Sequence, residues 1–170
     1  MKSLVTGCSG FIGSHLTEKL LEMGEVIGID CFADYYPREI KEKNMGGFIN
    51  NPSFEFIEQD ILKADLKKIL SQVDVVYHLA AQAGVRESWG ENFKIYTDND
   101  ILATQRLLEA CKNMSIKKFV YSSSSSIYGD VKTLPMKETD MPSPISPYGV
   151  SKLASEHLCN LYYKNFGIPT

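Results

Sequence analysis

The sequence predicts an α/β fold built on a doubly wound parallel sheet, and three observations carry that prediction. A glycine-spaced turn, Gly7-Cys8-Ser9-Gly10-Phe11-Ile12-Gly13, follows a short apolar run and precedes a helical pattern. A second apolar run ends in an acid at Asp30. Strand-like and helix-like segments then alternate along the chain, which is the order that gives a parallel sheet with right-handed crossover helices.

Each expected element follows from its local pattern. Continuous apolar runs are typical of strands that are buried on both faces of a parallel sheet. We expect such strands at residues 2–6, 25–30, 54–58, 73–78 and 117–122. Helical periodicity predicts helices at residues 12–23, 64–71, 99–113 and 147–166, and a short one at 38–45 within a polar, turn-rich insertion.

The glycine turn predicts a site for the diphosphate of a dinucleotide. Gly7 lets the chain bend sharply, and Gly10 lets the backbone approach the phosphates. The helix that follows directs free N–H groups and its positive dipole end to the same place. Such spacing also occurs in ordinary turns, but here it lies between a strand and a helix. Asp30 ends the next strand, where a carboxylate accepts hydrogen bonds from a ribose 2′-hydroxyl and disfavours a 2′-phosphate, so we expect NAD rather than NADP.

Size and composition set the class of protein. The 170 residues suit one domain, and 44% hydrophobic with 23% charged residues is ordinary for a globular chain. A net charge of −3 gives no basic field for nucleic acid or an anionic membrane, and we expect neither partner. Four scattered cysteines and three scattered histidines predict a cytoplasmic protein with reduced thiols and no metal site.

The end of the chain resembles the approach to another strand. Gly167 suits a helix terminator, and Ile168-Pro169-Thr170 follows it directly. We therefore expect residues 1–170 to be the N-terminal part of a longer protein, truncated before its last strands.

Two segments near the C-terminal end could carry chemistry. Ser146 and Pro147 predict a helix start, which places Tyr148 and Lys152 four residues apart on one helical face. A nearby ammonium group, a cationic nicotinamide ring and the helix N-terminus would each lower the pKa of the phenol and make Tyr148 a base. Such pairs also occur by chance on solvated helices. The serine run 122–126 strengthens the catalytic interpretation, because it follows a buried strand at the edge of the sheet where ligands bind.

Taken in order, these motifs resemble the extended short-chain dehydrogenase/reductase family, and more narrowly its NAD-dependent nucleotide-sugar epimerases and dehydratases. The resemblance covers essentially the whole chain and implies a Rossmann fold. It also implies that a C-terminal substrate domain is absent from these 170 residues. It implies catalytic roles for Ser124, Tyr148 and Lys152. It also implies that NAD is bound by Gly7, Gly10, Phe11, Ile12, Gly13, Asp30, Asp60, Ile61, Leu79, Ala80, Ala81, Gln82, Tyr148 and Lys152.

Departures from the family pattern narrow the expected reaction. Similar dehydratases carry Asp-Glu after the catalytic Thr, whereas this chain has Ser125 and Ser126, which are poor proton shuttles. Elimination and decarboxylation are therefore disfavoured relative to epimerisation. Asp100 stands where the family usually has an asparagine; Asn99 is its neighbour, so either the register differs or that contact is altered.

The segment from Gln82 to Trp89 resembles UDP-glucuronate 4-epimerases more than UDP-glucose 4-epimerases. Arg86 could neutralise a sugar carboxylate, with Ser124, Ser125 and Ser126 as further substrate contacts; equally, Arg86 could pair with a nearby acid. The expected function is NAD-dependent 4-epimerisation of a UDP-sugar, UDP-glucuronate favoured, through a transient 4-keto intermediate. A UDP-glucose 4-epimerase and an NAD-binding fragment without turnover of its own remain alternatives. The resemblance also implies a homodimer.

Overall fold

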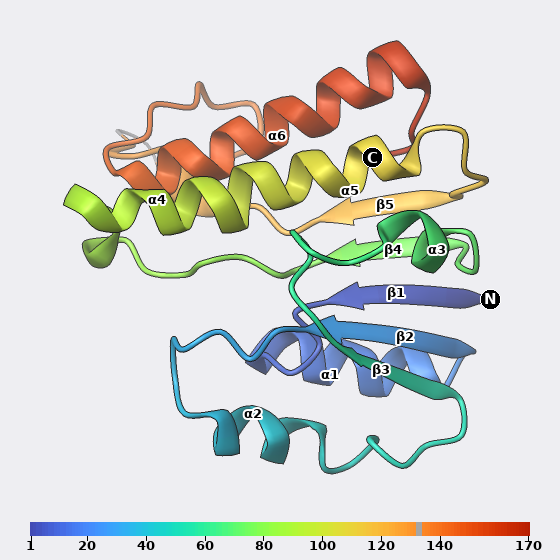
Figure 1. Ribbon diagram of the computed structural model, residues 1–170. Helices are drawn as coiled ribbons and strands as arrows, with labels where there is room; N and C mark the ends of the chain where they lie inside the picture. Colours follow the sequence, from blue (N-terminus) through green and yellow to red (C-terminus); the bar gives the residue numbers. More distant parts are fainter. Residues whose placement is uncertain (132–133) are drawn as a thin grey trace.

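Five parallel strands form one sheet in the computed structural model, which describes residues 1–131 and 134–170. Their spatial order is β3-β2-β1-β4-β5, so the chain winds outward from β1 in both directions (Figure 1). The strands are β1 (Lys2–Thr6), β2 (Glu25–Asp30), β3 (Phe54–Glu58), β4 (Val75–His78) and β5 (Lys118–Tyr121). The expected doubly wound Rossmann sheet is confirmed.

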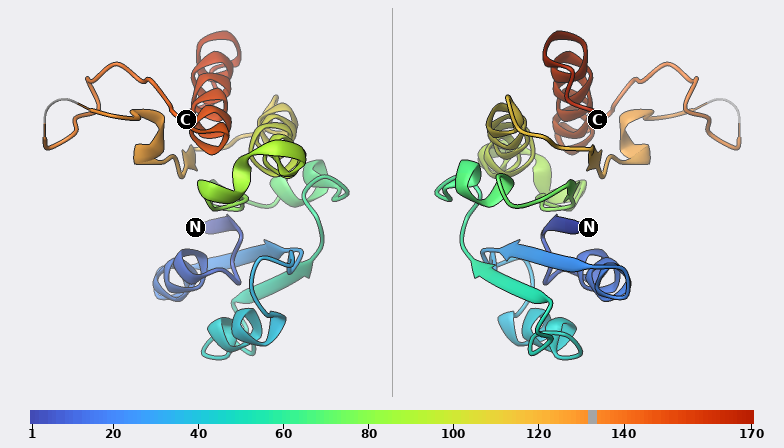
Figure 2. Two further views of the ribbon diagram at one scale, coloured as in Figure 1. Left: turned by 90° about the vertical axis from the view of Figure 1, so that its left-hand side faces the viewer. Right: turned by 90° about the vertical axis from the view of Figure 1, so that its right-hand side faces the viewer.

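Helices cover both faces of this sheet (Figure 2). One apolar core joins strand residues such as Leu4 and Val76 to side chains of α3 (Leu66–Leu70), α5 (Ala103–Cys111) and α6 (Pro147–Phe166). The neighbouring residue Val5 points the opposite way, into a second core with α1 (Phe11–Leu21) and α2 (Arg38–Met45). Alternation along a strand thus supplies both cores, as a sheet buried on two faces requires.

The register brings the strand ends into line at one edge. Thr6 of β1 is paired with Ile29 of β2 and with His78 of β4. All five strands are parallel, so the loops that follow them gather at this carboxyl edge, which is where doubly wound sheets bind ligands. At the outer edge, the backbone N–H of Phe119 donates to the carbonyl of Pro169 at 2.9 Å, so the last residues lie beside β5.

One helix begins earlier than its pattern predicts. The expected helix 99–113 is the continuation of α4 (Phe93–Tyr96), a π-helical turn (Thr97–Leu102) and then α5. The polar sequence from Asp98 to Asp100 resembles a helix start, but the structure places it inside the helix, where the π-helical turn buries Asp100 while Asp98 pairs with Lys94 at the surface. Among the described residues, no helix is long and apolar enough to span a membrane.

Candidate active site

The glycine turn is shaped by contacts that leave no room for a Cβ atom. Gly7 has φ +71°, and a Cβ there would lie 2.9 Å from the backbone nitrogen of Ala80. A Cβ on Gly13 would lie 2.0 Å from the Gly7 carbonyl oxygen. Gly10 caps α1 without a side-chain hydrogen bond, so the first N–H groups of the helix stay available to a ligand.

Phe11 and Ile12 offer their backbone rather than their side chains. Their side chains are 71% and 65% exposed, and yet both residues line the pocket at the carboxyl edge of the sheet. No acidic residue occupies the first turn of α1. The backbone N–H groups and the helix dipole therefore make this end of the pocket attractive to an anion such as a diphosphate.

The carboxylate of Asp30 is held beside the glycine turn. It accepts hydrogen bonds from the backbone N–H groups of Ser9, at 3.2 Å, and Phe32, at 2.9 Å. Asp60 is fixed similarly, because its side chain accepts from the backbone N–H of Leu62 at 2.8 Å. Both acids line the pocket and retain acceptor capacity toward it.

One pocket of about 360 Å³ contains every residue predicted to bind NAD except Tyr148 and Lys152. The predicted residues that line it are Gly7, Gly10, Phe11, Ile12, Gly13, Asp30, Asp60, Ile61, Leu79, Ala80, Ala81 and Gln82. Further lining residues, which were not predicted to bind NAD, are Ile29, Cys31, Ala33, Tyr35, Tyr36, Lys41, Gln59, Ala83, Asn99, Ala103 and Ser122. Their shape and chemistry fit a dinucleotide: an amide-rich cradle at one end, apolar walls, and a carboxylate for a ribose.

Tyr36 adds a polar group that points to the same ligand. Its hydroxyl group is buried and has no hydrogen-bond partner among the described residues. It lies 3.8 Å from the position of a Cβ on Gly10, at the phosphate end of the pocket. A hydroxyl without a partner at an anion-binding turn is a donor ready for a phosphate oxygen.

His78 supports the pocket from beneath and does not titrate near neutral pH. Burial lowers its pKa to about 3. Thr6 donates its hydroxyl to His78 Nδ1 at 2.7 Å, and Nε2 lies 3.0 Å from the Thr104 hydroxyl, which itself donates to the carbonyl of Asp100. The Thr6 hydroxyl oxygen also accepts from the backbone N–H of Ala80, at 3.0 Å, so this network fixes the residues that leave β4.

The start of α6 is locked against the serine segment. Ser146 accepts from the backbone N–H of Gly149 at 3.1 Å, which is the N-cap that the sequence predicts, and Pro147 occupies the first turn. A Cβ on Gly149 would lie 2.5 Å from the carbonyl oxygen of Ser126. The glycine after Tyr148 therefore lets α6 approach the serine segment closely.

Tyr148 and Lys152 lie beside the pocket rather than in its lining. The Tyr148 ring packs edge-on against Tyr96, with 6.1 Å between ring centroids, and the Tyr96 hydroxyl donates to the Gly84 carbonyl at 2.7 Å. The Lys152 ammonium lies 4.5 Å from the ring centroid of Tyr121 at the end of β5. Both side chains thus meet the carboxyl edge of the sheet next to Ser122, which does line the pocket.

The protein's own groups do not make Tyr148 acidic. Burial raises the pKa of Tyr148, Asp100 adds to this increase, and the neighbouring Ser124 side chain opposes it. Burial lowers the pKa of Lys152, while the charge of Asp100 raises it. Of the described groups that shift the Tyr148 pKa, the Ser124 side chain is the one that lowers it, and the positive charge of a bound coenzyme would lower it further.

The structure places the predicted substrate residues in different environments. Ser124 caps a short 3₁₀ turn (Ser125–Ile127) and accepts from the backbone N–H of Ser126 at 3.1 Å, on the side that faces Tyr148. Ser125 is exposed. Arg86 is exposed in a 3₁₀ turn (Arg86–Ser88) and does not line the pocket, so its contact with a sugar stays a prediction.

The structure places the neighbours Asn99 and Asp100 differently with respect to the pocket. Asn99 lines the pocket, whereas Asp100 is buried behind it. The Asp100 carboxylate accepts from the backbone N–H of Gln82 at 2.8 Å and from the Ser151 hydroxyl at 2.6 Å. The altered residue therefore joins the pocket wall to α6.

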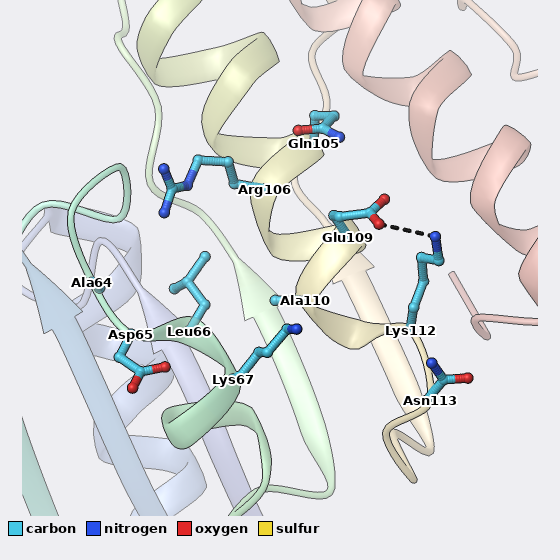
Figure 3. Close-up of a pocket in the computed structure, with 10 residues that line it drawn as sticks. All are labelled: Ala64, Asp65, Leu66, Lys67, Gln105, Arg106, Glu109, Ala110, Lys112 and Asn113. Atoms are coloured by element: carbon cyan, nitrogen blue, oxygen red, sulfur yellow. Dashed lines mark hydrogen bonds and ion pairs between the residues drawn. The ribbon is translucent and has the colours of Figure 1, made fainter.

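A larger cavity, of about 510 Å³, lies elsewhere and lacks this chemistry. It is an open groove between α3 and α5 in which Glu109 forms an ion pair with Lys112 at 2.9 Å (Figure 3). Tyr162 of α6 also donates to Glu109, at 2.7 Å. The groove contains none of the residues predicted to bind or react, so the smaller pocket is the candidate active site.

Comparison with known proteins identifies the family of this chain. The model of the family described as GDP-mannose 4,6 dehydratase matches residues 4–170. The chain belongs to this family. The resemblance to nucleotide-sugar epimerases and dehydratases is thereby confirmed, and relatives of both kinds occur within the family.

Two relatives illustrate the epimerase side of the family. A Bacillus subtilis protein described as an uncharacterized UDP-glucose epimerase is 50% identical over 171 residues, covering 99% of this chain and 54% of the relative. The crystal structure of UDP-glucuronic acid 4-epimerase from Bacillus cereus, in complex with UDP-glucuronic acid and NAD, is 51% identical with a TM-score of 0.96. It covers 99% of this chain and 54% of that one.

A dehydratase of the same family is more distant in sequence. The structure of dTDP-glucose 4,6-dehydratase from Streptomyces venezuelae, with NAD bound, is 30% identical with a TM-score of 0.89, covering 99% of this chain and 53% of that one. The chain thus spans about half the length of the relatives that it matches.

Proposed function

We propose that this chain is the NAD-binding part (residues 1–170) of an epimerase that inverts C4 of a UDP-sugar, with UDP-glucuronate and UDP-galacturonate as the favoured pair. The observation that carries the proposal is the junction of two sites at one edge of the sheet. The glycine-turn pocket with Asp30 extends to Ser122, beside which Lys152 lies over the Tyr121 ring and Tyr148 lies next to Ser124. The NAD and UDP-sugar complexes of relatives about 50% identical support it.

NAD is the coenzyme that these residues suit. The N–H groups of Phe11 and Ile12 and the Tyr36 hydroxyl would hold the diphosphate, and Asp30 the adenosine ribose. When bound, NAD supplies the acceptor and then the donor of a hydride at C4, so the cycle consumes no coenzyme.

Tyr148 handles the proton in this mechanism. Its phenolate takes the proton of the C4 hydroxyl as the C4 hydrogen leaves as hydride, and it gives the proton back when hydride returns to the opposite face of the 4-keto sugar. Ser124 hydrogen-bonds the C4 oxygen, and Lys152 keeps a positive charge beside the phenolate. Ser125 and Ser126 offer no carboxylic acid for the elimination of water, which favours epimerisation over dehydration.

Arg86 and the serine segment bear on the choice of sugar. Arg86 and the hydroxyls of Ser124 to Ser126 would bind a C6 carboxylate, although Arg86 lies outside the pocket of this chain. A UDP-glucose 4-epimerase is the second candidate, because the Bacillus subtilis relative described as a UDP-glucose epimerase is 50% identical and two relatives described as UDP-glucose 4-epimerases are 38% identical, at 95–99% coverage of this chain. We also propose that the protein forms a homodimer.

The test uses the full-length protein and UDP-glucuronate without added reductant. We expect formation of UDP-galacturonate, slower turnover of UDP-glucose, and a loss of kcat of about 10³-fold in Tyr148→Phe. Tyr163→Phe, at an exposed tyrosine of the same helix, is the matched control and should leave kcat unchanged. Undiminished turnover in Tyr148→Phe would refute the proposal.

The same measurements on residues 1–170 separate the remaining alternative. Calorimetric titration with NAD gives the affinity of the coenzyme, and an epimerase assay on the same sample gives the turnover. Binding without turnover supports the interpretation that this part holds the coenzyme and that the sugar needs more of the protein.

A further inference from the structure

We propose that Asp100 is a positioning residue for the reaction, which clamps the coenzyme pocket to the catalytic helix and balances the buried charge of Lys152. The inference rests on the proposed function, because it concerns the residues that serve Tyr148. Asp100 is 1% exposed and Lys152 is 3% exposed. Buried charged groups are retained in proteins when they are paired or hydrogen-bonded.

The clamp has one contact on each side of the site. Oδ1 of Asp100 accepts from the backbone N–H of Gln82, which lines the pocket. Oδ2 accepts from the hydroxyl of Ser151, the residue before Lys152 on α6. The Asp100 carbonyl also accepts from the Ser155 hydroxyl at 3.0 Å, one turn further along the same helix. One residue therefore fixes the distance between the pocket wall and the helix that carries the reacting groups.

These contacts alone do not require a carboxylate. An asparagine could accept from the Gln82 N–H and donate to Ser151, whose hydroxyl could then donate to the carbonyl of Tyr148, already 2.8 Å away. The charge of Asp100 must therefore be explained separately from its geometry. Removing one partner of a buried charge pair leaves the other uncompensated, which is costly.

The groups around Lys152 leave Asp100 as its main opposing charge. On α6 it faces Tyr148, Glu156 and Cys159; β5 presents the Tyr121 ring, and β4 presents the neutral His78. Asp100 raises the Lys152 pKa more than Glu156 or Cys159 does, against the lowering caused by burial. The carboxylate thus opposes the lowering of the Lys152 pKa that burial causes.

Replacing Asp100 by asparagine should shift two titrations in one direction. Loss of the negative charge lowers the pKa of Lys152, which Asp100 raises, and lowers that of Tyr148, which Asp100 also raises. The acid limb of the rate profile follows deprotonation of Tyr148, and the alkaline limb follows loss of the Lys152 proton. Both limbs should move to lower pH by about one unit, which is the order of shift expected when one nearby buried charge is removed.

The charge is tested first on residues 1–170, without substrate. Lysine labelled with ¹³C at Cε is titrated by NMR, and the Lys152 signal is assigned by its loss in Lys152→Met. We expect the Lys152 midpoint in Asp100→Asn to fall by about one pH unit. Asp98→Asn is the matched control, because it removes an equal charge from the same turn, where Asp98 pairs with Lys94. An unshifted Lys152 midpoint in Asp100→Asn, or an equal shift in Asp98→Asn, would overturn the proposal.

The clamp is tested by NAD affinity. Asp100→Asn should bind NAD nearly as well as the parent, whereas Asp100→Ala and Ser151→Ala should lose about tenfold, because a buried partner is left unpaired. Ser151→Ala keeps the test decisive if Asp100→Ala does not fold; unchanged affinity in Ser151→Ala would refute the clamp. In the full-length protein, Asp100→Asn should shift the rate profile to lower pH. An absence of epimerase activity in the parent protein would count against the proposed function but not against a shifted Lys152 midpoint.

Discussion

Lys41 is the one cationic residue among the described residues that line the coenzyme pocket. Its ammonium group donates to the Ala33 carbonyl at 2.7 Å and lies 5.1 Å from the ring centroid of Tyr36. A buried lysine that lines the same pocket as an anion-binding turn is typical of a residue that binds a negatively charged ligand. We infer that it stabilises the bound diphosphate and holds the insertion over it.

Replacement of Lys41 by methionine should therefore weaken NAD binding. Methionine keeps most of the apolar stem but removes the charge and the hydrogen bond to Ala33, so we expect the dissociation constant to rise about tenfold, or ~1.4 kcal/mol. Lys43→Met, at an exposed position of the same helix, should bind NAD as the parent does. Calorimetric titration of the three proteins measures the difference, and equal affinities for all three would contradict the assignment.

The sequence predicts Asp30 but not Lys41, for a physical reason. Asp30 ends an apolar strand downstream of the glycine turn, so the fold class alone places it at the ribose. Lys41 lies in α2, a predominantly polar helix, where Lys41 and Met45 are the residues that the structure buries. No periodicity distinguishes Lys41 from its neighbours; the face that packs inward is set by the tertiary contact with the Tyr36 ring.

At two glycines of the turn into α1, an added Cβ atom would have different consequences. At Gly13 an added Cβ meets the Gly7 carbonyl at 2.0 Å, so the helix itself cannot keep its position. At Gly10 the nearest protein atom would be 3.2 Å away, and φ is −71°, which alanine adopts without strain. The space in front of Gly10 is the approach to the pocket rather than part of the core.

These glycines give a paired prediction. Gly13→Ala should lower the free energy of unfolding by about 2–4 kcal/mol, as overpacking against backbone does. Gly10→Ala should change it by less than about 1 kcal/mol and yet weaken NAD binding at least tenfold, because the methyl group blocks the approach of the diphosphate. Urea unfolding and NAD titration distinguish the two, and full NAD affinity in Gly10→Ala would remove the phosphate role of the turn.

The helical segment before α5 begins earlier than its local sequence pattern predicts. Asp98, Asn99 and Asp100 are residues that favour helix starts, so the sequence places the start among them. In the structure they occupy a π-helical turn, where Asp100 is buried by contacts with Gln82 and Ser151, far away along the chain. Those partners are known only once the fold is formed, so propensity could not identify a polar residue that belongs inside the helix.

The arrangement of the whole molecule follows closely from the alternation of its elements. The five parallel strands are wound outward from β1, so the loop after each strand contributes residues to the same pocket. Motifs that are far apart along the chain therefore line one site. The alternation does not determine which exposed surface of the outer helices contacts another protomer. Neighbouring apolar residues of α6 differ in this respect, because Tyr162 lies in the core and Leu161 is exposed.

The outer surface of α6 carries the proposal of a homodimer. Val150 and Leu161 are 45% and 53% exposed, and their spacing of eleven residues is about three helical turns, which puts them on one face. Ile95 and Leu102 are exposed on the adjoining helix that α6 packs against. A self-complementary pairing of such faces about a two-fold axis would bury all four in each protomer.

Lysine at both Val150 and Leu161 should then weaken self-association without weakening the fold. Both side chains are about half exposed, so their loss costs the monomer little, whereas four charges would meet across a two-fold interface. Sedimentation equilibrium of the full-length protein should give a dimer for the parent and a dissociation constant raised at least 100-fold for Val150→Lys/Leu161→Lys. Met141→Lys, at an apolar residue that is exposed outside the helices, should remain a dimer. A parent protein that is monomeric, or a double variant that dimerises as tightly as the parent, would assign the exposed face of α6 to some other contact.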